Sequence, residues 1–128
     1  MKLVYVALSA VVLFTACQKD DDDIAPSVSI SSPSVGAAYV GGQPILIAGN
    51  ITDNESLHEF YILITKNDGA DTLLNESISI HDETNHTFAE TFTAPAVTDT
   101  TDVRLDVSAE DHDGNIGSRA FSFKIVPQ

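Results

Sequence analysis

Val103-Arg104-Leu105-Asp106-Val107-Ser108-Ala109-Glu110 alternates apolar and polar side chains without a break. Successive side chains of a β-strand point to opposite faces, so this pattern predicts a strand with one face in a hydrophobic core and the other in solvent. The inward set is expected to be Val103, Leu105, Val107 and Ala109. Such a strand needs a second layer to cover its apolar face, and the flanking sequence supplies the candidates.

Stretches with the same two-residue period lie on both sides of this strand, separated by turn-forming residues. No window after Ser27 shows the periodicity of a helix. Six further strands are predicted at residues 27–31, 45–52, 59–65, 72–80, 87–93 and 121–125. Seven strands in about 100 residues indicate an all-β fold, an immunoglobulin-like seven-stranded β-sandwich over residues 27–128. A small Greek-key barrel is the alternative.

Aliphatic and phenylalanine side chains are expected to hold the two sheets together. The chain has no Trp and one Cys, so the Cys–Trp–Cys set of antibody domains is absent. Ile47, Phe121 and Phe123 fall on the apolar faces of their strands and are expected to join the core.

The net charge excludes several classes of partner. Six Lys and Arg stand against 19 Asp and Glu, which gives a net charge of −13. A nucleic-acid binder needs a basic surface to neutralise phosphates, and this chain has none to offer. Attachment to anionic lipid through basic side chains is excluded for the same reason.

The N-terminus predicts export. Lys2 precedes an uncharged apolar run, Leu3–Phe14, which is too short to span a bilayer but has the length of a signal-peptide core. The run ends in Phe14-Thr15-Ala16-Cys17 and resembles a bacterial lipoprotein signal, although Leu is usual where Phe14 stands. Residues 1–16 are therefore expected to be removed, leaving Cys17 as the lipid attachment site. The alternative is an ordinary signal peptide followed by a chance cysteine.

Residues 17–26 are expected to form an acidic tether behind the lipidated cysteine. Asp20, Asp21, Asp22 and Asp23 are consecutive carboxylates that repel one another, so the stretch is expected to be extended and solvated. With Lys19 it also resembles the Lys-plus-acidic run that follows the lipid cysteine in surface-exported lipoproteins of the Bacteroidota. That resemblance implies an outer-membrane lipoprotein exposed on the cell surface. A plain solubilising linker is the alternative.

The chain as a whole resembles a family of Bacteroidota lipoproteins known as domain of unknown function 4625. The resemblance rests on the lipid cysteine with its acidic run, on "APSVSISSP", on "VGGQPILIAGNITDNESLHEFYILI" and on "VSAEDHDGNIGSRAFSFKI". Its most specific pieces are residues 53–57 and 111–115. The resemblance implies an immunoglobulin-like fold and an envelope location, and it adds no catalytic residue.

No enzymatic machinery is evident in the sequence. There is no G-x-S-x-G nucleophile motif and no helix to follow a glycine-rich phosphate loop. The expected function is that of a lipid-anchored, non-catalytic binding or adhesion module for a protein or glycan. An accessory subunit of a larger envelope complex and a Ca²⁺-binding domain are the alternatives.

Sandwich topology is expected to gather the loops near residues 53–58, 81–86 and 111–115 at the end where the tether enters. Asp53, Glu55, Asp111 and Asp113 are the candidate ligands for Ca²⁺, which prefers clustered oxygen atoms. All four histidines map to the same end and would suit Zn²⁺ or another transition ion: His58, His81, His86 and His112. Alternatively, these Asp and Asn side chains only stabilise turns.

Two short motifs predict modification at the opposite end. Asp71-Thr72-Leu73 and Asp99-Thr100-Thr101 resemble O-glycosylation sites of the Bacteroidota. Thr72 and Thr100 are therefore candidate glycan attachment sites.

Overall fold

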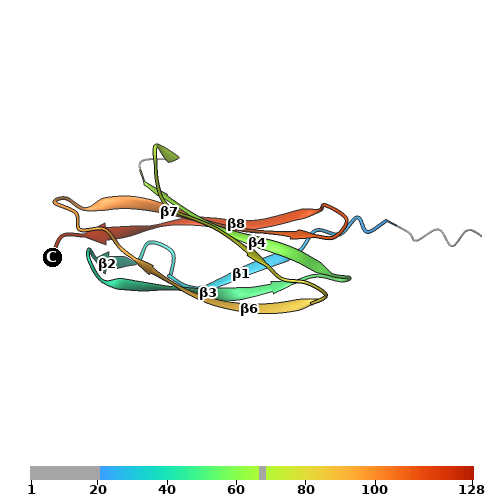
Figure 1. Cartoon of the computed structure of the whole chain (residues 1–128). Helices are drawn as coiled ribbons and strands as arrows, with labels where there is room; N and C mark the ends of the chain where they lie inside the picture. Colours follow the sequence, from blue (N-terminus) through green and yellow to red (C-terminus); the bar gives the residue numbers. More distant parts are fainter. Residues whose placement is uncertain (1–20, 67–68) are drawn as a thin grey trace, which may run out of the picture.

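The computed structural model describes residues 21–66 and 69–128 (Figure 1). The predicted signal peptide (1–16) and Cys17 lie outside the described residues. The described strands are β1 (Ser27–Ser32), β2 (Ala38–Val40), β3 (Pro44–Thr52), β4 (Leu57–Lys66), β5 (Asp71–Ser79), β6 (Asn85–Thr93), β7 (Thr101–Asp111) and β8 (Ile116–Val126). No helix among these residues is long and apolar enough to cross a membrane.

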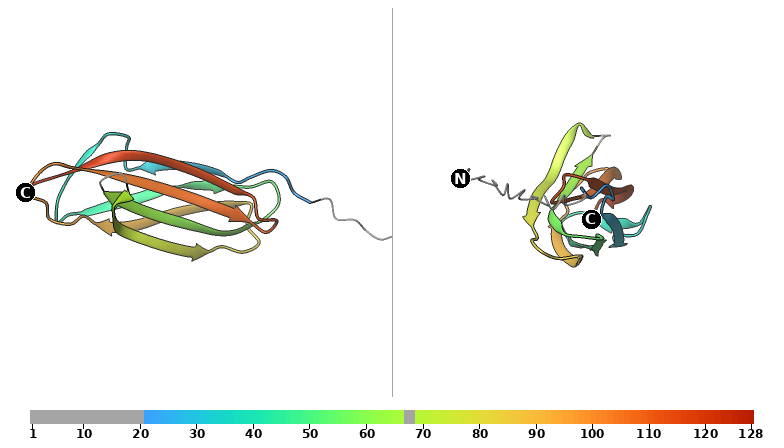
Figure 2. Two further views of the ribbon diagram at one scale, coloured as in Figure 1. Left: turned by 90° about the horizontal axis from the view of Figure 1, so that it is seen from above. Right: turned by 90° about the vertical axis from the view of Figure 1, so that its right-hand side faces the viewer.

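The strands form two sheets that pack face to face as an immunoglobulin-like sandwich, as predicted. One sheet has the order β1-β3-β6 and the other β2-β8-β7-β4-β5. Neighbouring strands are antiparallel except β2 and β8, which are parallel. Figure 2 shows the elongated sandwich from above and from one end, with the strands running along its length.

The described residues form eight strands rather than the seven predicted. Residues 38–40 fall in a Gly- and Ala-rich segment that was expected to be a turn, yet they pair in register with residues 124–126 of β8. The Lys124 amide donates to the Ala37 carbonyl at 2.8 Å. The Tyr39 ring packs edge-on against Phe123, with 5.7 Å between ring centroids. This aromatic contact and the free edge of β8 explain why so short a segment becomes a strand.

The core lies between the sheets and follows the predicted alternation. Val103, Leu105, Val107 and Ala109 of β7 are at most 1% exposed. The other fully buried large side chains come from both sheets: Phe60, Phe123, Ile45, Ile47, Ile51, Leu57, Ile62, Ile64 and Ile125. Phe121 is only partly buried, against expectation. It pairs with Leu105, but β2 pairs with β8 only from Lys124 onward, so within residues 21–66 and 69–128 no strand pairs with the outer edge of β8 beside Phe121.

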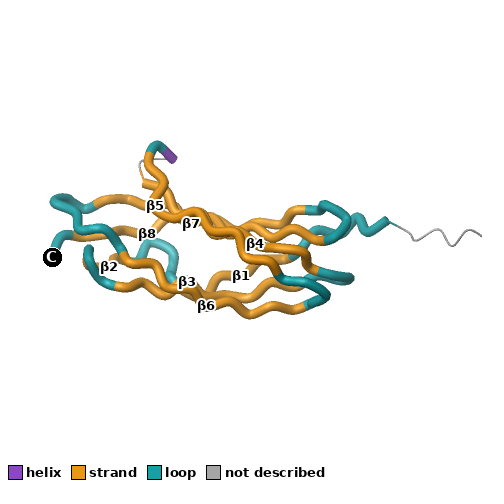
Figure 3. The backbone as a smooth tube through the Cα atoms, in the orientation of Figure 1, coloured by secondary structure: helices purple, strands orange, loops and turns teal. Residues whose placement is uncertain are grey.

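Three loops gather at the end of the sandwich where residues 21–26 enter, as predicted (Figure 3). We call this the proximal end; it consists of residues 21–26 and the β3–β4, β5–β6 and β7–β8 loops. Backbone hydrogen bonds tie the loops to one another: Asp53 N to Thr84 O (2.9 Å), Leu57 N to Glu83 O (2.8 Å) and His112 N to Ser56 O (3.2 Å). The opposite, distal end carries the β6–β7 loop and the C-terminus (Figure 1).

Candidate functional site

Asp111 ends β7 and holds the turn that follows it. Its carboxylate Oδ1 accepts hydrogen bonds from the backbone amides of Asp113 (2.9 Å) and Asn115 (2.8 Å), and Oδ2 accepts one from Asn115 Nδ2 (2.7 Å). Burial to 2% exposure opposes ionisation of the Asp111 carboxyl, but these hydrogen bonds outweigh it and hold its pKa below the usual value. Asp111 is therefore a buried anion at neutral pH.

Asp53 follows β3 and shapes the β3–β4 loop. Its Oδ2 accepts from the amides of Glu55 (2.9 Å) and Ser56 (2.8 Å), a local turn of the type expected for Asp. Its Oδ1 is buried and has no hydrogen-bond partner among the described residues. A buried carboxylate oxygen without a partner is costly, because it has lost water and gained nothing in exchange.

Asp22 contradicts the expectation of a fully solvated tether, since it is 8% exposed. Its Oδ1 accepts from Ile24 N at 2.9 Å and its Oδ2 from Asn54 Nδ2 at 3.0 Å. Its backbone carbonyl accepts from Asn115 Nδ2 at 2.6 Å. The segment can lie this close because of Gly117, where a Cβ would stand 1.7 Å from the Pro26 carbonyl oxygen.

The candidate ligands fall into two groups, and Asp22 belongs to both. Asp22, Asp53 and Asp111 each offer one carboxylate oxygen within 4.8 Å of the others, and we call these three residues the acidic cluster. Asp22, Glu55 and Asp113 form a second set with the same spacing. Four of these five carboxylates were predicted as ligands, whereas Asp22 was expected to belong to the tether. No local signal separates Asp22 from the three aspartates beside it, because its burial depends on Asn54 and Asn115.

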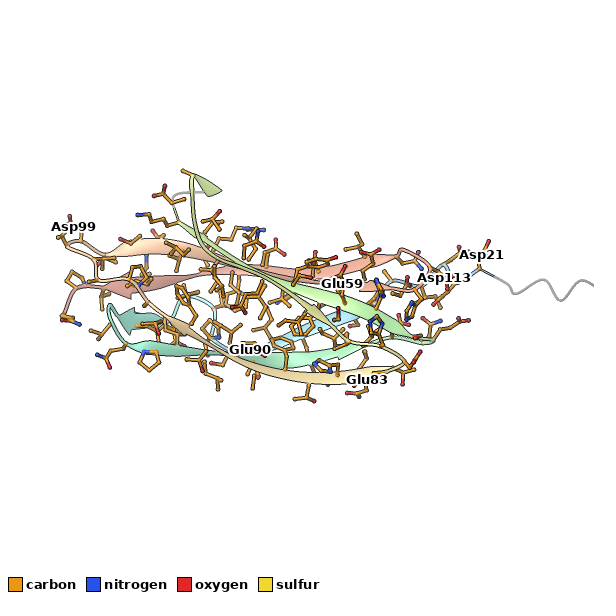
Figure 4. All side chains as sticks on the ribbon, in the orientation of Figure 1. Asp21, Glu59, Glu83, Glu90, Asp99 and Asp113 are labelled. Carbon is orange, nitrogen blue, oxygen red and sulfur yellow. The ribbon has the colours of Figure 1, made fainter. Side chains whose placement is uncertain are left out.

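Among the described residues, the ion pairs of Lys and Arg side chains lie outside the acidic cluster. Where the described residues form such ion pairs, the partners are Lys66–Asp71 (3.1 Å), Arg104–Asp106 (3.7 Å) and Lys124–Asp102 (2.6 Å). None of these pairs involves a residue of the acidic cluster. Figure 4 shows Asp21 and Asp113 at the proximal end and Asp99 at the distal end. Oxygen ligands at this spacing suit a hard divalent cation such as Ca²⁺.

The four histidines lie at the proximal end as predicted. Three of them have neighbouring rings, and the fourth lies apart from these. His58, His81 and His112 have ring centroids 4.9 to 5.8 Å apart, and we call them the histidine cluster. His86 stands apart, with its Nδ1 2.8 Å from a Glu83 carboxylate oxygen and its ring against Phe60.

A hollow of about 500 Å³ opens on the outer face of the five-stranded sheet. Its walls come from β4, β5, β7 and the residue Gly69 before β5: Leu63, Thr65, Gly69, Thr72, Arg104 and Asp106. This hollow was not predicted, because no sequence pattern shows that outward residues of separate strands share a surface. Thr72, a predicted glycan site, lies in its wall and is exposed, and Thr100 is exposed in the β6–β7 loop. Glycosylation of either stays a prediction.

Comparisons with known proteins agree with this fold. The model of a family described as "Domain of unknown function (DUF4625)" matches residues 15–126. No curated protein matches the sequence. Among solved structures, OgpA of Akkermansia muciniphila is 14% identical with a TM-score of 0.56, over 80% of this chain and 29% of its own. The sporulation control protein Spo0M of Bacillus subtilis is 13% identical with a TM-score of 0.51, over 81% of this chain and 49% of its own.

A fibronectin(III)-like module of Clostridium thermocellum CbhA is 16% identical with a TM-score of 0.48, over 77% of this chain and 94% of its own. The chain thus spans less than a third of OgpA and about half of Spo0M. At these identities the likenesses concern the fold alone.

Proposed function

The chain belongs to the family described as domain of unknown function DUF4625, and from this premise we propose that it is a lipid-anchored, non-catalytic binding module of the bacterial cell envelope. The anchor is the lipid on Cys17, and the localisation is the outer membrane with the domain exposed at the cell surface. The observation that carries a binding role is the open hollow on the five-stranded sheet. It combines a half-exposed cation, Arg104, with the exposed apolar side chain of Leu63 in a strongly acidic protein.

The docked Asp22 sets the orientation of the domain in this proposal. An extended chain advances by at most about 3.6 Å per residue, so Asp22 stays within roughly 18 Å of Cys17. The proximal end therefore faces the membrane. The hollow lies on the half of the sheet away from that end, because Thr65 pairs with Thr72 at one end of β4 whereas Glu59 pairs with Ser79 at the other. A protein or glycan on a neighbouring molecule would reach it there.

Cells that express the anchored chain provide the test. Cys17→Ala is expected to abolish acylation of the mature N-terminal peptide and to release the protein from the membrane fraction. Cross-linked partners are then recovered from intact cells and identified by mass spectrometry. Arg104→Glu is expected to reduce partner recovery at least tenfold, whereas the matched control Arg119→Glu, also exposed and on the same sheet, is expected to retain it.

Two results would overturn the proposal. Membrane retention of Cys17→Ala would exclude the lipid anchor. Equal recovery with Arg104→Glu and Arg119→Glu would exclude the hollow as the binding surface. A partner recovered in constant stoichiometry by every variant would instead indicate the accessory-subunit role.

A second role is favoured by the acidic cluster, and we propose that it binds a divalent cation, with Ca²⁺ preferred. Three carboxylates within 4.8 Å repel one another, and the buried Asp53 Oδ1 has no partner among the described residues. A cation would supply that partner and relieve the repulsion. Because Asp22 belongs to the N-terminal segment, the cation would also fasten that segment to the β3–β4 and β7–β8 loops. The role is therefore structural, fixing the domain relative to its anchor.

A further inference from the structure

We propose that His58, His81 and His112 form a binding site for a transition-metal ion of the Zn²⁺ class. The site is distinct from the acidic cluster, because its ligands are ring nitrogens rather than carboxylate oxygens. It also stands independently of the lipid anchor and the hollow. Each histidine offers one ring nitrogen, and the three nitrogens lie within 4.8 Å of one another.

The backbone brings the three histidines together from segments far apart in the sequence. His58 is the second residue of β4, His81 follows β5, and His112 begins the β7–β8 turn. Ile80 N donates to the His58 carbonyl at 2.9 Å, and His112 N donates to the Ser56 carbonyl at 3.2 Å. Sheet and loop hydrogen bonds therefore fix the starting point of each side chain.

The spacing of the rings suits a shared ion. The centroids are 4.9 Å apart for His58 and His112, 5.3 Å for His58 and His81, and 5.8 Å for His81 and His112. Zinc–nitrogen bonds of about 2.0–2.1 Å in a tetrahedral site place ligand nitrogens about 3.3 Å apart. Nitrogens already within 4.8 Å can reach that separation by side-chain rotation, since the side chains of His81 and His112 are exposed.

One ring nitrogen of the histidine cluster is left without a hydrogen-bond partner by the described residues. His58 Nδ1 is buried and has no hydrogen-bond partner among the described residues. Native proteins rarely leave such a nitrogen unpaired, because burial removes its water. A metal ion bound at this nitrogen would supply the partner that the described residues do not.

The donor set determines which ions compete. Neutral imidazole favours Zn²⁺, Cu²⁺, Ni²⁺ and Co²⁺, whereas Ca²⁺ and Mg²⁺ require oxygen ligands. Three histidines leave a fourth coordination position for water or for a ligand from another molecule. Ligation uses the neutral form of each imidazole ring.

The test uses an untagged chain of residues 18–128, which retains every described contact and the whole core. Co²⁺ serves as the spectroscopic probe and Zn²⁺ as the competitor. The wild-type chain is expected to bind one equivalent of Co²⁺ with visible absorption bands of tetrahedral coordination, which stoichiometric Zn²⁺ abolishes. Excess Ca²⁺ is expected to leave these bands unchanged.

Variants assign the ligands. His81→Ala and His112→Ala are expected to weaken Zn²⁺ binding at least tenfold, and unfolding in the presence of chelator shows whether each variant is folded. The matched control is His86→Ala, since His86 lies at the same end but outside the cluster; it is expected to bind as the wild type does. Absence of binding at micromolar Zn²⁺, equal binding by His81→Ala and wild type, or loss of binding in His86→Ala alone would overturn the proposal.

Discussion

The side-chain amide of Asn115 donates to the backbone carbonyl of Asp22 at 2.6 Å across 93 residues of sequence. The same nitrogen donates to Asp111 Oδ2 at 2.7 Å. Asn115 thus links the N-terminal segment to a buried carboxylate of β7. One side chain therefore connects the β7–β8 turn to residues 21–26.

Asn115→Ala is expected to lower the free energy of unfolding by about 1–3 kcal/mol, because it leaves the buried Asp111 carboxylate with one partner fewer. It should also release Asp22, and hydrogen exchange at Ile24 N reports that release. Urea unfolding of residues 18–128 measures the stability change. Asn75→Ala, on the exposed face of β5, is the control and is expected to change stability by less than about 0.5 kcal/mol. Equal losses in the two variants would contradict the link.

Leu105 and Asp106 test the face assignment of β7. Leu105 is 0% exposed, so Leu105→Ala is expected to cost about 2–5 kcal/mol through lost burial and the cavity left behind. Asp106 points outward and forms only a partly exposed pair with Arg104 at 3.7 Å, so Asp106→Ala should cost less than about 1 kcal/mol. Denaturant unfolding of both variants makes the comparison. Similar losses would mean that the register of β7 is wrong.

The Tyr61 hydroxyl is expected to ionise at a higher pH than an ordinary tyrosine. Its hydroxyl donates to the Glu59 carboxylate, and this bond, with partial burial and the charges of Glu59 and Glu110, raises the pKa of Tyr61 from 10.0 to about 12. The folded state holds the phenolic proton more tightly than the unfolded state does. Stability from this group is therefore complete below pH 10 and is lost as the pH rises toward 12.

Absorbance at 295 nm in a Tyr39→Phe background of residues 18–128 follows Tyr61 alone. Glu59→Gln removes the charge and should move the titration to lower pH. Glu90→Gln, in the other sheet, should leave it in place. If Tyr61 titrates at the same pH in the Glu59→Gln variant as it does with Glu59 present, the hydrogen bond to Glu59 does not control the pKa of Tyr61.

Sequence patterns predicted the structural features that depend on strand periodicity. They did not predict the features that depend on contacts between residues far apart in the sequence. Alternation in residues 103–110 was enough to place Leu105 in the core, since a strand has only two faces. The gathering of the histidines followed from sandwich connectivity. Asp22 was misplaced because its burial depends on Asn54, Asn115 and the missing Cβ of Gly117, none of which is near it in sequence. Residues 38–40 were missed because a strand that short is specified by its partner β8 rather than by its own pattern.

The acidic cluster predicts that Ca²⁺ reverses the order of stability of the wild type and the Asp53→Asn variant. Asp53→Asn keeps a side-chain oxygen to accept from the Glu55 and Ser56 amides but removes one of three mutually repelling charges. In chelator, the variant is therefore expected to melt at the same temperature as the wild type or higher. In Ca²⁺ at a hundredfold excess over Kd, the wild type should gain about 2.7 kcal/mol and the variant much less.

Thermal unfolding of residues 18–128 in chelator, Ca²⁺, Mg²⁺ or Zn²⁺ measures this reversal. For a domain of this size the Ca²⁺ gain corresponds to a rise of about 10 °C in the wild-type melting temperature. Asp99→Asn, at the distal end, removes the same charge outside the acidic cluster and should respond to Ca²⁺ as the wild type does. NaCl at matched ionic strength separates binding from screening, because screening acts on all three chains alike. If Ca²⁺ moves the wild type no further than NaCl does, or moves Asp53→Asn equally, the three carboxylates hold turns and bind no cation.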